Sequence, residues 1–200
     1  MTSPSPSTTT ETRPAHRPSA REAMLDAAEA HLGADGTLSL EAAARAAGVS
    51  KPGLMYHFAT KEDLLAAVLD RIAERYEQEM LARITESGGQ SAEDLAGVPA
   101  RQRFLAYLQW SCQGSLSPAD LVIFADPRLR VTLTERWQEQ LDRWLVVPPE
   151  TPADLRRRLL AVRLMADGVW FDRASGLLEI PADETASLEE TAADLLGGES

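Results

Sequence analysis

Residues 38–65 constrain the fold more than any other part of the chain, because several helix start and stop signals lie close together there. Ser39 is a good N-cap for a first short helix, and Gly48 ends it because glycine adopts the left-handed conformation without steric cost. Ser50 then caps a second short helix that has Pro52 in its first turn. Two short helices joined by a tight turn are typical of a helix-turn-helix, whose second helix enters the DNA major groove.

The apolar positions of this stretch support the same interpretation. The first helix is rich in alanine, and small side chains let the second helix cross it closely. The outward side of the second helix is expected to carry Lys51, Gly53, Met55, Tyr56 and His57. A capping box of Thr60 and Asp63 then starts a third helix, with Lys61 at its first position.

The run from Gly48 to Phe58, followed by Lys61 and a Leu64-Leu65 pair, resembles the DNA-binding signature of the TetR/AcrR family of transcriptional regulators. The resemblance covers about residues 19–66. It implies an all-α fold, with an N-terminal three-helix helix-turn-helix domain and a C-terminal helical domain for ligand binding and dimerisation. One departure is Met55, which stands where the family often has tyrosine.

The resemblance also implies which residues contact DNA. Those expected to lie against phosphates are Ser39, Tyr56, His57 and Lys61. Those expected to face base edges are Lys51, Pro52, Gly53 and Met55, and Ser50 begins that helix within the same site. Lys51 is the best candidate for a direct hydrogen bond to a base, because lysine pairs with the acceptors of guanine in the major groove.

Three segments are expected. Residues 1–18 are rich in Ser, Thr and Pro and predict a disordered arm, which either reaches DNA or is an inert solvated tail. Residues 19–66 would form the helix-turn-helix domain, and residues 67–200 the helical ligand-binding and dimerisation domain. A long helix over 61–86 would join the two, because apolar residues recur along it at spacings of three and four. Further helices are expected over about 101–115, 126–146, 154–175 and 183–196.

The net charge of −11 does not exclude DNA binding, because the acidic residues are unevenly distributed. Residues 12–61 carry six Lys or Arg and five Asp or Glu, so the excess acid lies in the rest of the chain. An acidic body would weaken non-specific binding and orient the near-neutral end toward DNA, or it is simply solvated helix surface. No apolar run is long enough to span a membrane, so we expect a cytoplasmic protein with no membrane partner.

Catalytic and metal chemistry find little support in the sequence. The single cysteine, Cys112, excludes a cysteine-rich zinc site, and no cluster of His, Cys, Asp and Glu has metal-ligand spacing. No glycine-rich loop follows a strand pattern, so nucleotide motifs are absent. We expect no catalytic residues, no metal and no cofactor, and therefore not an enzyme.

The aromatic residues of the C-terminal part allow two interpretations. They are either core packing or the lining of an apolar cavity between helices, and the family resemblance favours the cavity. The residues expected to bind a small, apolar or aromatic effector are Tyr107, Leu108, Ser111, Cys112, Phe124, Trp137 and Trp170. The basic run at Arg156, Arg157 and Arg158 is not expected to face one pocket, because three consecutive helical residues point in different directions.

A homodimer interface is expected on the last two helices, where two helices from each subunit would close a four-helix bundle. The residues assigned to it are Leu159, Val162, Ala166, Val169, Leu188 and Leu195. The alternative is that this apolar stripe is core within one chain. Together these features predict a DNA-binding transcriptional regulator, a ligand-released repressor that binds a palindromic double-stranded DNA operator as a homodimer. The rivals are a helical protein-interaction module of the same fold that does not bind DNA, and an enzyme.

Overall fold

The computed structural model describes residues 19–88, 93–177 and 180–197, and within these ranges the chain is helical with no β-strand, which confirms the all-α prediction. The elements are α1 (Ala20–Asp35), α2 (Leu40–Ala46), α3 (Lys51–His57), α4 (Lys61–Glu86), η1 (Leu95–Gly97), α5 (Ala100–Gln113), η2 (Pro118–Phe124), α6 (Arg130–Trp144), α7 (Ala153–Ser175) and α8 (Ala182–Gly197). The elements η1 and η2 are 3₁₀ helices.

The predicted caps position the first four helices. Ser39 and Ser50 each accept a hydrogen bond from a backbone N–H of the helix that follows, at 3.1 and 3.2 Å. Thr60 and Asp63 make both bonds of the capping box, each 3.0 Å long. Gly48 has a φ of 66°, the left-handed conformation that a helix end of this kind requires.

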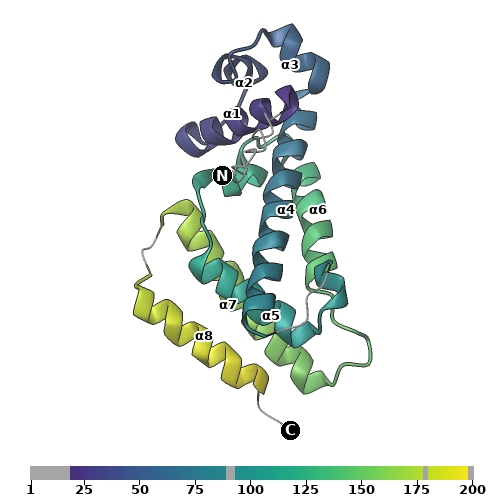
Figure 1. The fold of residues 1–200 in the computed structure, drawn as a ribbon, viewed down its shortest axis with the longest axis vertical. Helices are drawn as coiled ribbons and strands as arrows, with labels where there is room; N and C mark the ends of the chain where they lie inside the picture. The colour runs from purple at the N-terminus through teal and green to yellow at the C-terminus, as the bar shows by residue number, and fades with distance from the viewer. Residues whose placement is uncertain (1–18, 89–92, 178–179, 198–200) are drawn as a thin grey trace, which may run out of the picture.

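Helix α4 connects the two ends of the molecule. The ribbon places α1–α3 together at one end, and α4 runs from them along the body beside α6 (Figure 1). Its predicted apolar face is buried, from Leu65 to Ile84. The boundary expected between residues 66 and 67 falls inside α4, which continues without a break. The DNA-binding end and the body therefore share one rigid element.

Helix α1 continues through Gly33 and is capped by Gly36. One predicted boundary needs correction. The helix expected from Asp126 starts only at Arg130. The Asp126 carboxylate accepts a hydrogen bond from the Arg128 backbone N–H at 2.9 Å, so the residues before α6 form a side-chain-stabilised turn instead of helix.

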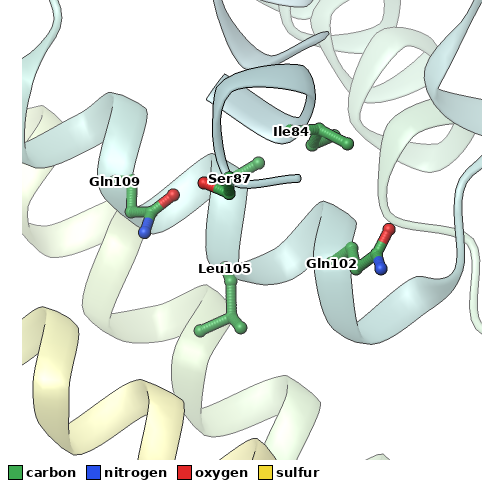
Figure 2. Close-up of a pocket in the computed structure, with 6 residues that line it drawn as sticks. Ile84, Ser87, Gln102, Leu105 and Gln109 are labelled. Carbon is green, nitrogen blue, oxygen red and sulfur yellow. The ribbon is translucent and has the colours of Figure 1, made fainter. Parts of the chain in front are cut away.

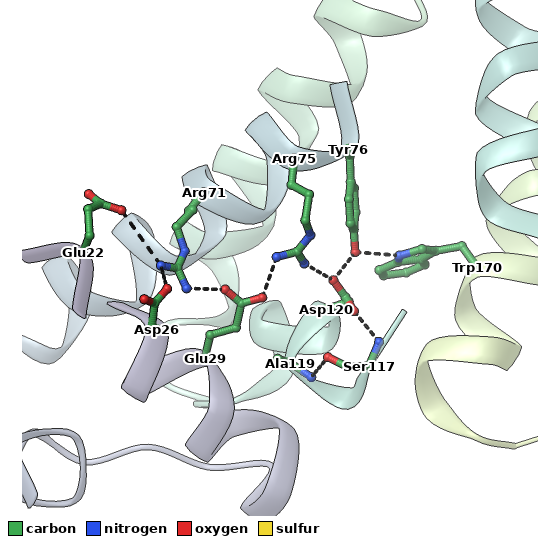
Figure 3. A network of polar contacts seen from close by, with 10 residues as sticks. All are labelled: Glu22, Asp26, Glu29, Arg71, Arg75, Tyr76, Ser117, Ala119, Asp120 and Trp170. Atoms are coloured by element: carbon green, nitrogen blue, oxygen red, sulfur yellow. Dashed lines mark hydrogen bonds and ion pairs between the residues drawn. The ribbon is translucent and has the colours of Figure 1, made fainter. Parts of the chain in front are cut away.

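A network of charged and aromatic side chains ties α1 to the body (Figure 3). Arg71 of α4 donates to Asp26 and Glu29 of α1 at 2.6 and 2.5 Å. The network continues through Arg75, which donates to Glu29 at 2.6 Å and to Asp120 of η2 at 3.1 Å. It therefore joins the helix-turn-helix end to the 3₁₀ helix η2.

Asp120 is the most enclosed member of this network, since its side chain is 0% exposed. One carboxylate oxygen accepts from the Tyr76 hydroxyl at 2.5 Å and the other from the Ser117 backbone N–H at 2.5 Å. Burial and then the Asp120 charge raise the pKa of Tyr76 above its ordinary value, so its hydroxyl stays protonated and donates. The indole N–H of Trp170 on α7 reaches the same hydroxyl oxygen at 3.4 Å.

We expect Asp120→Ala to lower the free energy of unfolding by roughly 2–4 kcal/mol, because it leaves a buried hydroxyl and a half-buried guanidinium without their shared acceptor. The matched control is Asp26→Ala, which removes a carboxylate that is 64% exposed from the same network. That change should cost less than about 1 kcal/mol, since exposed ion pairs contribute little. Chemical denaturation of both variants measures the difference, and equal losses would contradict the role given to Asp120.

Candidate functional site

The outward face of α3 is set by what its other face buries. Leu54 and Phe58 are almost fully buried, and α3 packs against α2, where Ala43 and Ala44 leave room for the close crossing. The opposite side presents Met55 and Tyr56, which are 40% and 86% exposed. Lys51, Pro52 and His57 are also exposed, whereas Gly53 is half-buried. The outward face was therefore predicted correctly except at Gly53.

The start of α3 is stabilised by local contacts. The Ser50 hydroxyl caps the Gly53 N–H, and a Cβ on Gly53 would lie 3.2 Å from that hydroxyl oxygen. The Lys51 ammonium lies 2.5 Å from the Glu41 carboxylate on α2. The hydrogen bond from Lys51 lowers the pKa of Glu41 below its ordinary value. Both groups are exposed, so this ion pair leaves Lys51 free to exchange Glu41 for another acceptor.

Lys61, at the first position of α4, has a partner that the sequence did not predict. Its ammonium lies 2.7 Å from the Asp126 carboxylate, which stands on the segment between η2 and α6. The side chains are 29% and 18% exposed, so the pair is partly shielded from water. The hydrogen bond from Lys61, and then that from the Arg128 backbone, hold the pKa of Asp126 below its ordinary value. The pair is therefore charged at neutral pH.

The residues expected to bind an effector are mostly packed in the core. Tyr107, Leu108, Ser111 and Cys112 are buried on α5, and Trp137 and Trp170 stack at 6.0 Å between ring centroids. Phe124 differs, since it is 46% exposed with the Arg130 guanidinium 6.0 Å from its ring. Every predicted member except Phe124 is therefore buried in the hydrophobic core. Ligand binding by this set stays a prediction.

The polar groups of this set already have partners. The Tyr107 hydroxyl donates to Asp167 at 2.8 Å, and the Ser111 hydroxyl donates to the Tyr107 carbonyl at 2.9 Å. Burial raises the pKa of the Cys112 thiol to about 11, with the Glu189 carboxylate adding to the effect. A thiol with such a pKa is largely protonated at neutral pH, so Cys112 is a weak nucleophile.

Three of the hollows in the described part of the chain lie away from this set or at its edge. The smallest, about 130 Å³, lies between the end of α4 and α5 beside Ser87, Gln102 and Gln109 (Figure 2). A shallow one of about 730 Å³ runs along the charged network between α1, α4 and η2. The third, about 350 Å³, is lined by Phe104, Leu145, Val147, Arg156, Arg157, Leu160 and Arg163.

The third hollow agrees with the expectation that the three consecutive arginines do not all face one pocket. Arg156 and Arg157 line this hollow together with Arg163, which lies about two turns further along α7. Arg158 lies on another side of the helix, where it donates to the Leu195 carbonyl of α8 at 3.0 Å. Three consecutive arginines indeed do not share one face, but two of them do, together with a third that lies further along the chain.

The predicted dimer stripe also needs correction. Leu159, Val162 and Ala166 are 0% exposed and Val169 is 4% exposed, because this side of α7 packs inside the single chain, mainly against α5. The four α7 residues therefore form core within one chain. Leu188 and Leu195 of α8 are only half-buried against the same core, so their place in a dimer interface stays a prediction. The apolar side of α7 that remains exposed carries Leu160, Leu164 and Phe171, at 52%, 60% and 42%.

Three further expectations concern the N-terminal arm, metal binding and membrane spanning. Residues 1–18, the predicted arm, lie outside the described residues. Across residues 19–88, 93–177 and 180–197, no three His, Cys, Asp or Glu side chains are grouped to hold a metal ion. In those same ranges no helix combines the length and the apolar character needed to cross a bilayer.

A helix-turn-helix with an exposed second helix, carried on an all-helical body, is the architecture of a DNA-binding regulator. Comparison with family models agrees with this class. Residues 24–68 match the model of "Bacterial regulatory proteins, tetR family", and residues 101–197 match that of a "Tetracyclin repressor-like, C-terminal domain". The chain belongs to the TetR family, and it is a DNA-binding transcriptional regulator.

Solved structures share this fold at low sequence identity. A protein described as a TetR-family transcriptional regulator from Rhodococcus sp. aligns with a TM-score of 0.60 at 19% identity, over 90% of this chain and 99% of its own. GusR of Salmonella enterica aligns with a TM-score of 0.54 at 16% identity, over 90% and 96%. The multidrug binding protein EbrR, complexed with imidazole, gives 0.52 at 21% identity, over 92% and 98%. A comparison with curated proteins found no match.

Proposed function

We propose that this regulator is a ligand-released repressor that binds a palindromic operator as a homodimer. The observation that carries the proposal is the free outward face of α3, which is held by caps and buried on its other side. In this proposal, Lys51, Pro52, Gly53 and Met55 face base edges in the major groove. Tyr56, His57, Ser39 and Lys61 lie against phosphates on either side.

A mobility shift with DNA from upstream of its own gene tests this assignment. Lys51→Ala should change the sequence preference at one position, because a base contact contributes about 1–3 kcal/mol to discrimination. Lys61→Ala should weaken all sequences alike and lower the salt slope by about 1, because it removes one phosphate contact. No shift with any native fragment would favour the protein-interaction module, and an unchanged preference profile in Lys51→Ala would refute the base contact.

The Lys61–Asp126 ion pair supplies a physical basis for switching. Lys61 cannot bind a phosphate and the Asp126 carboxylate fully at once, since both compete for one ammonium group. Asp126 belongs to the body and Lys61 to the start of α4, so a shift of the body against α4 changes the balance. An effector can release DNA only if it favours a geometry in which the DNA contacts are poorer.

We therefore expect Asp126→Asn to tighten operator binding by about two- to fivefold, the range of a partly exposed ion pair. Asparagine keeps an oxygen for the Arg128 N–H, so the turn before α6 should persist. Asp70 lies elsewhere on α4 and forms an ion pair with Arg136 of α6. Asp70→Asn removes the same charge from that pair, so it is the matched control. Titration of labelled operator measures the operator affinity of both variants. Equal tightening in the two would mean that the loss of one negative charge, and not the Lys61–Asp126 pair, causes the effect.

The exposed apolar stripe of α7 is the candidate surface for the homodimer. Leu164 and Phe171 are seven residues apart, so they lie on one face of the helix, whereas Leu160 one turn earlier lines the hollow beside Arg157. A contiguous exposed apolar face on a protein of this charge indicates a surface covered by a partner. A two-fold axis at this face would pair α7 with its copy, and it would place two α3 helices for two half-sites.

Leu164→Glu should convert dimers to monomers in sedimentation while the helix content stays unchanged, because Leu164 is 60% exposed in the single chain. Val131→Glu introduces the same acidic side chain on α6, at a position that is 69% exposed and outside the α7 face. Dimers should persist in that control. Dimers that survive Leu164→Glu would exclude this face.

A small molecule as the releasing ligand is supported by the shared fold. EbrR, a multidrug binding protein, has been solved in complex with ethidium, and that structure aligns with a TM-score of 0.51 at 23% identity over 90% of this chain. The sequence favours an apolar or aromatic effector on the strength of the aromatic residues. Because these residues are buried, we propose that the effector enters the protein at one of the hollows.

A further inference from the structure

We propose that the hollow between α5, α7 and the segment joining α6 to α7 binds an organic anion, a molecule with one acidic head group and an apolar body. The hollow measures about 350 Å³, within the range of small-molecule sites in proteins. The proposal stands on two features of its lining, an apolar wall and a concentration of arginine side chains.

The apolar wall comes from three parts of the chain. Phe104 of α5 is buried at 2% exposure, and Leu145 is nearly buried at 7%. Val147 lies two residues further along the same segment, and Leu160 of α7 is half-exposed at the rim. These side chains offer an apolar ligand body a surface already partly shielded from water, which favours its transfer from solvent.

The arginines make the same hollow positive. Arg157 is 73% exposed, and its only ion pair within the described ranges is with Asp154 at 3.1 Å. The Arg163 side chain lies 3.4 Å from Asp167, a carboxylate that also accepts the Tyr107 hydroxyl. Arg156 donates to the Pro149 carbonyl at 2.8 Å, and among the described residues no carboxylate lies within 4.0 Å of its guanidinium. Positive charge therefore exceeds negative charge around the hollow.

Arg103 adds a further positive charge behind the wall. It is 3% exposed and donates to the carbonyls of Trp144 and Val146 at 2.8 and 2.7 Å, on either side of Leu145. Burial lowers its pKa below the ordinary value for arginine. No carboxylate of the described chain lies within 4.0 Å of its guanidinium, and its buried Nε atom makes no hydrogen bond there. An anion bound beside Leu145 would be attracted by this buried charge, which water screens poorly.

The other two hollows are less suited to such a ligand. That between α4 and α5 holds about 130 Å³. That along the charged network is shallow, and its arginines Arg71 and Arg75 are already paired with carboxylates of α1. Because the whole protein carries a net charge of −11, an organic anion is repelled by most of the surface and favoured at this site.

The identity of this ligand as the releasing effector rests on the proposed function, whereas its binding does not. Binding is therefore measured first, without DNA, by calorimetry of the full chain with octanoate and with octanol. The two probes share an apolar chain and differ in the acidic head. Octanoate should bind at least about tenfold more tightly than octanol, the order of a charge-assisted hydrogen bond. Equal binding, or no binding of octanoate, would overturn the proposal.

Two neighbouring substitutions locate the site. Arg157→Gln removes a guanidinium from the lining, whereas Arg158→Gln removes the same charge from the adjacent residue, which lies on the α8 side. We expect octanoate affinity to fall about fivefold to tenfold in Arg157→Gln and in Arg163→Gln, and less than twofold in Arg158→Gln. Thermal unfolding checks that each variant is folded. Equal losses at Arg157 and Arg158 would mean that net charge alone attracts the anion, and would overturn the site.

Operator release is the second measurement, and it separates the two proposals. If octanoate binds in the hollow and also lowers operator affinity in the wild type but not in Arg163→Gln, the hollow is the effector site. If octanoate binds with the expected variant pattern and operator affinity stays constant, the anion site holds and its role as effector is wrong. A chain that binds octanoate but no DNA would refute the proposed function and leave the site intact.

Discussion

The enclosed carboxylate of Asp120 is the interaction on which the arrangement of this molecule depends. It joins α4 to η2 through Arg75 and Tyr76, and the Tyr76 hydroxyl lies within reach of the Trp170 indole on α7. A buried carboxylate is costly unless its acceptor positions are filled, and here both oxygens have donors. The same requirement holds η2 in one position against α4, and η2 in turn packs against α1 of the DNA-binding end. The orientation of the helix-turn-helix relative to the body is therefore specified by polar contacts as well as by apolar packing.

Helix α4 connects this fixed arrangement to Lys61 at the DNA-binding end, so it is the element proposed to transmit regulation. At its first residue Lys61 is paired with Asp126 of the body, in its middle Arg71 and Arg75 bind α1 and η2, and Tyr76 packs against the aromatic core. An exchangeable ion pair at the DNA end lies on the same rigid element as a well-packed core. In the proposed switch, a small displacement of the body alters the phosphate contact assigned to Lys61 without unfolding either end. Coupling of this kind needs two arrangements of similar free energy, and the Lys61 ammonium has two candidate partners.

Charge is unevenly distributed over this protein. The chain is strongly acidic overall, yet its recognition end is near neutral and arginines gather around the hollow beside α7. The basic groups at the recognition end have exposed or exchangeable partners, whereas Arg103 is buried with carbonyl partners only among the described residues. Excess negative charge elsewhere raises the selectivity of both places for anions, since competing non-specific contacts are weakened. The two proposed ligands, DNA and an organic anion, are consistent with this distribution.

The sequence by itself determined the elements whose causes are local. Ser39, Ser50 and Thr60 cap helices, and Gly48 takes the left-handed conformation, because each acts within about four residues of its own position. The outward face of α3 followed from the same local periodicity and from the family resemblance. Only the tertiary structure decided which apolar stripe of α7 is buried, because Leu159 and Leu160 are equally apolar and the choice depends on α5, some fifty residues earlier in the chain. It likewise decided that Lys61 meets Asp126 and that Arg156, Arg157 and Arg163 share a hollow with Phe104. Such pairings depend on how distant helices cross, and no local signal in the chain encodes that geometry.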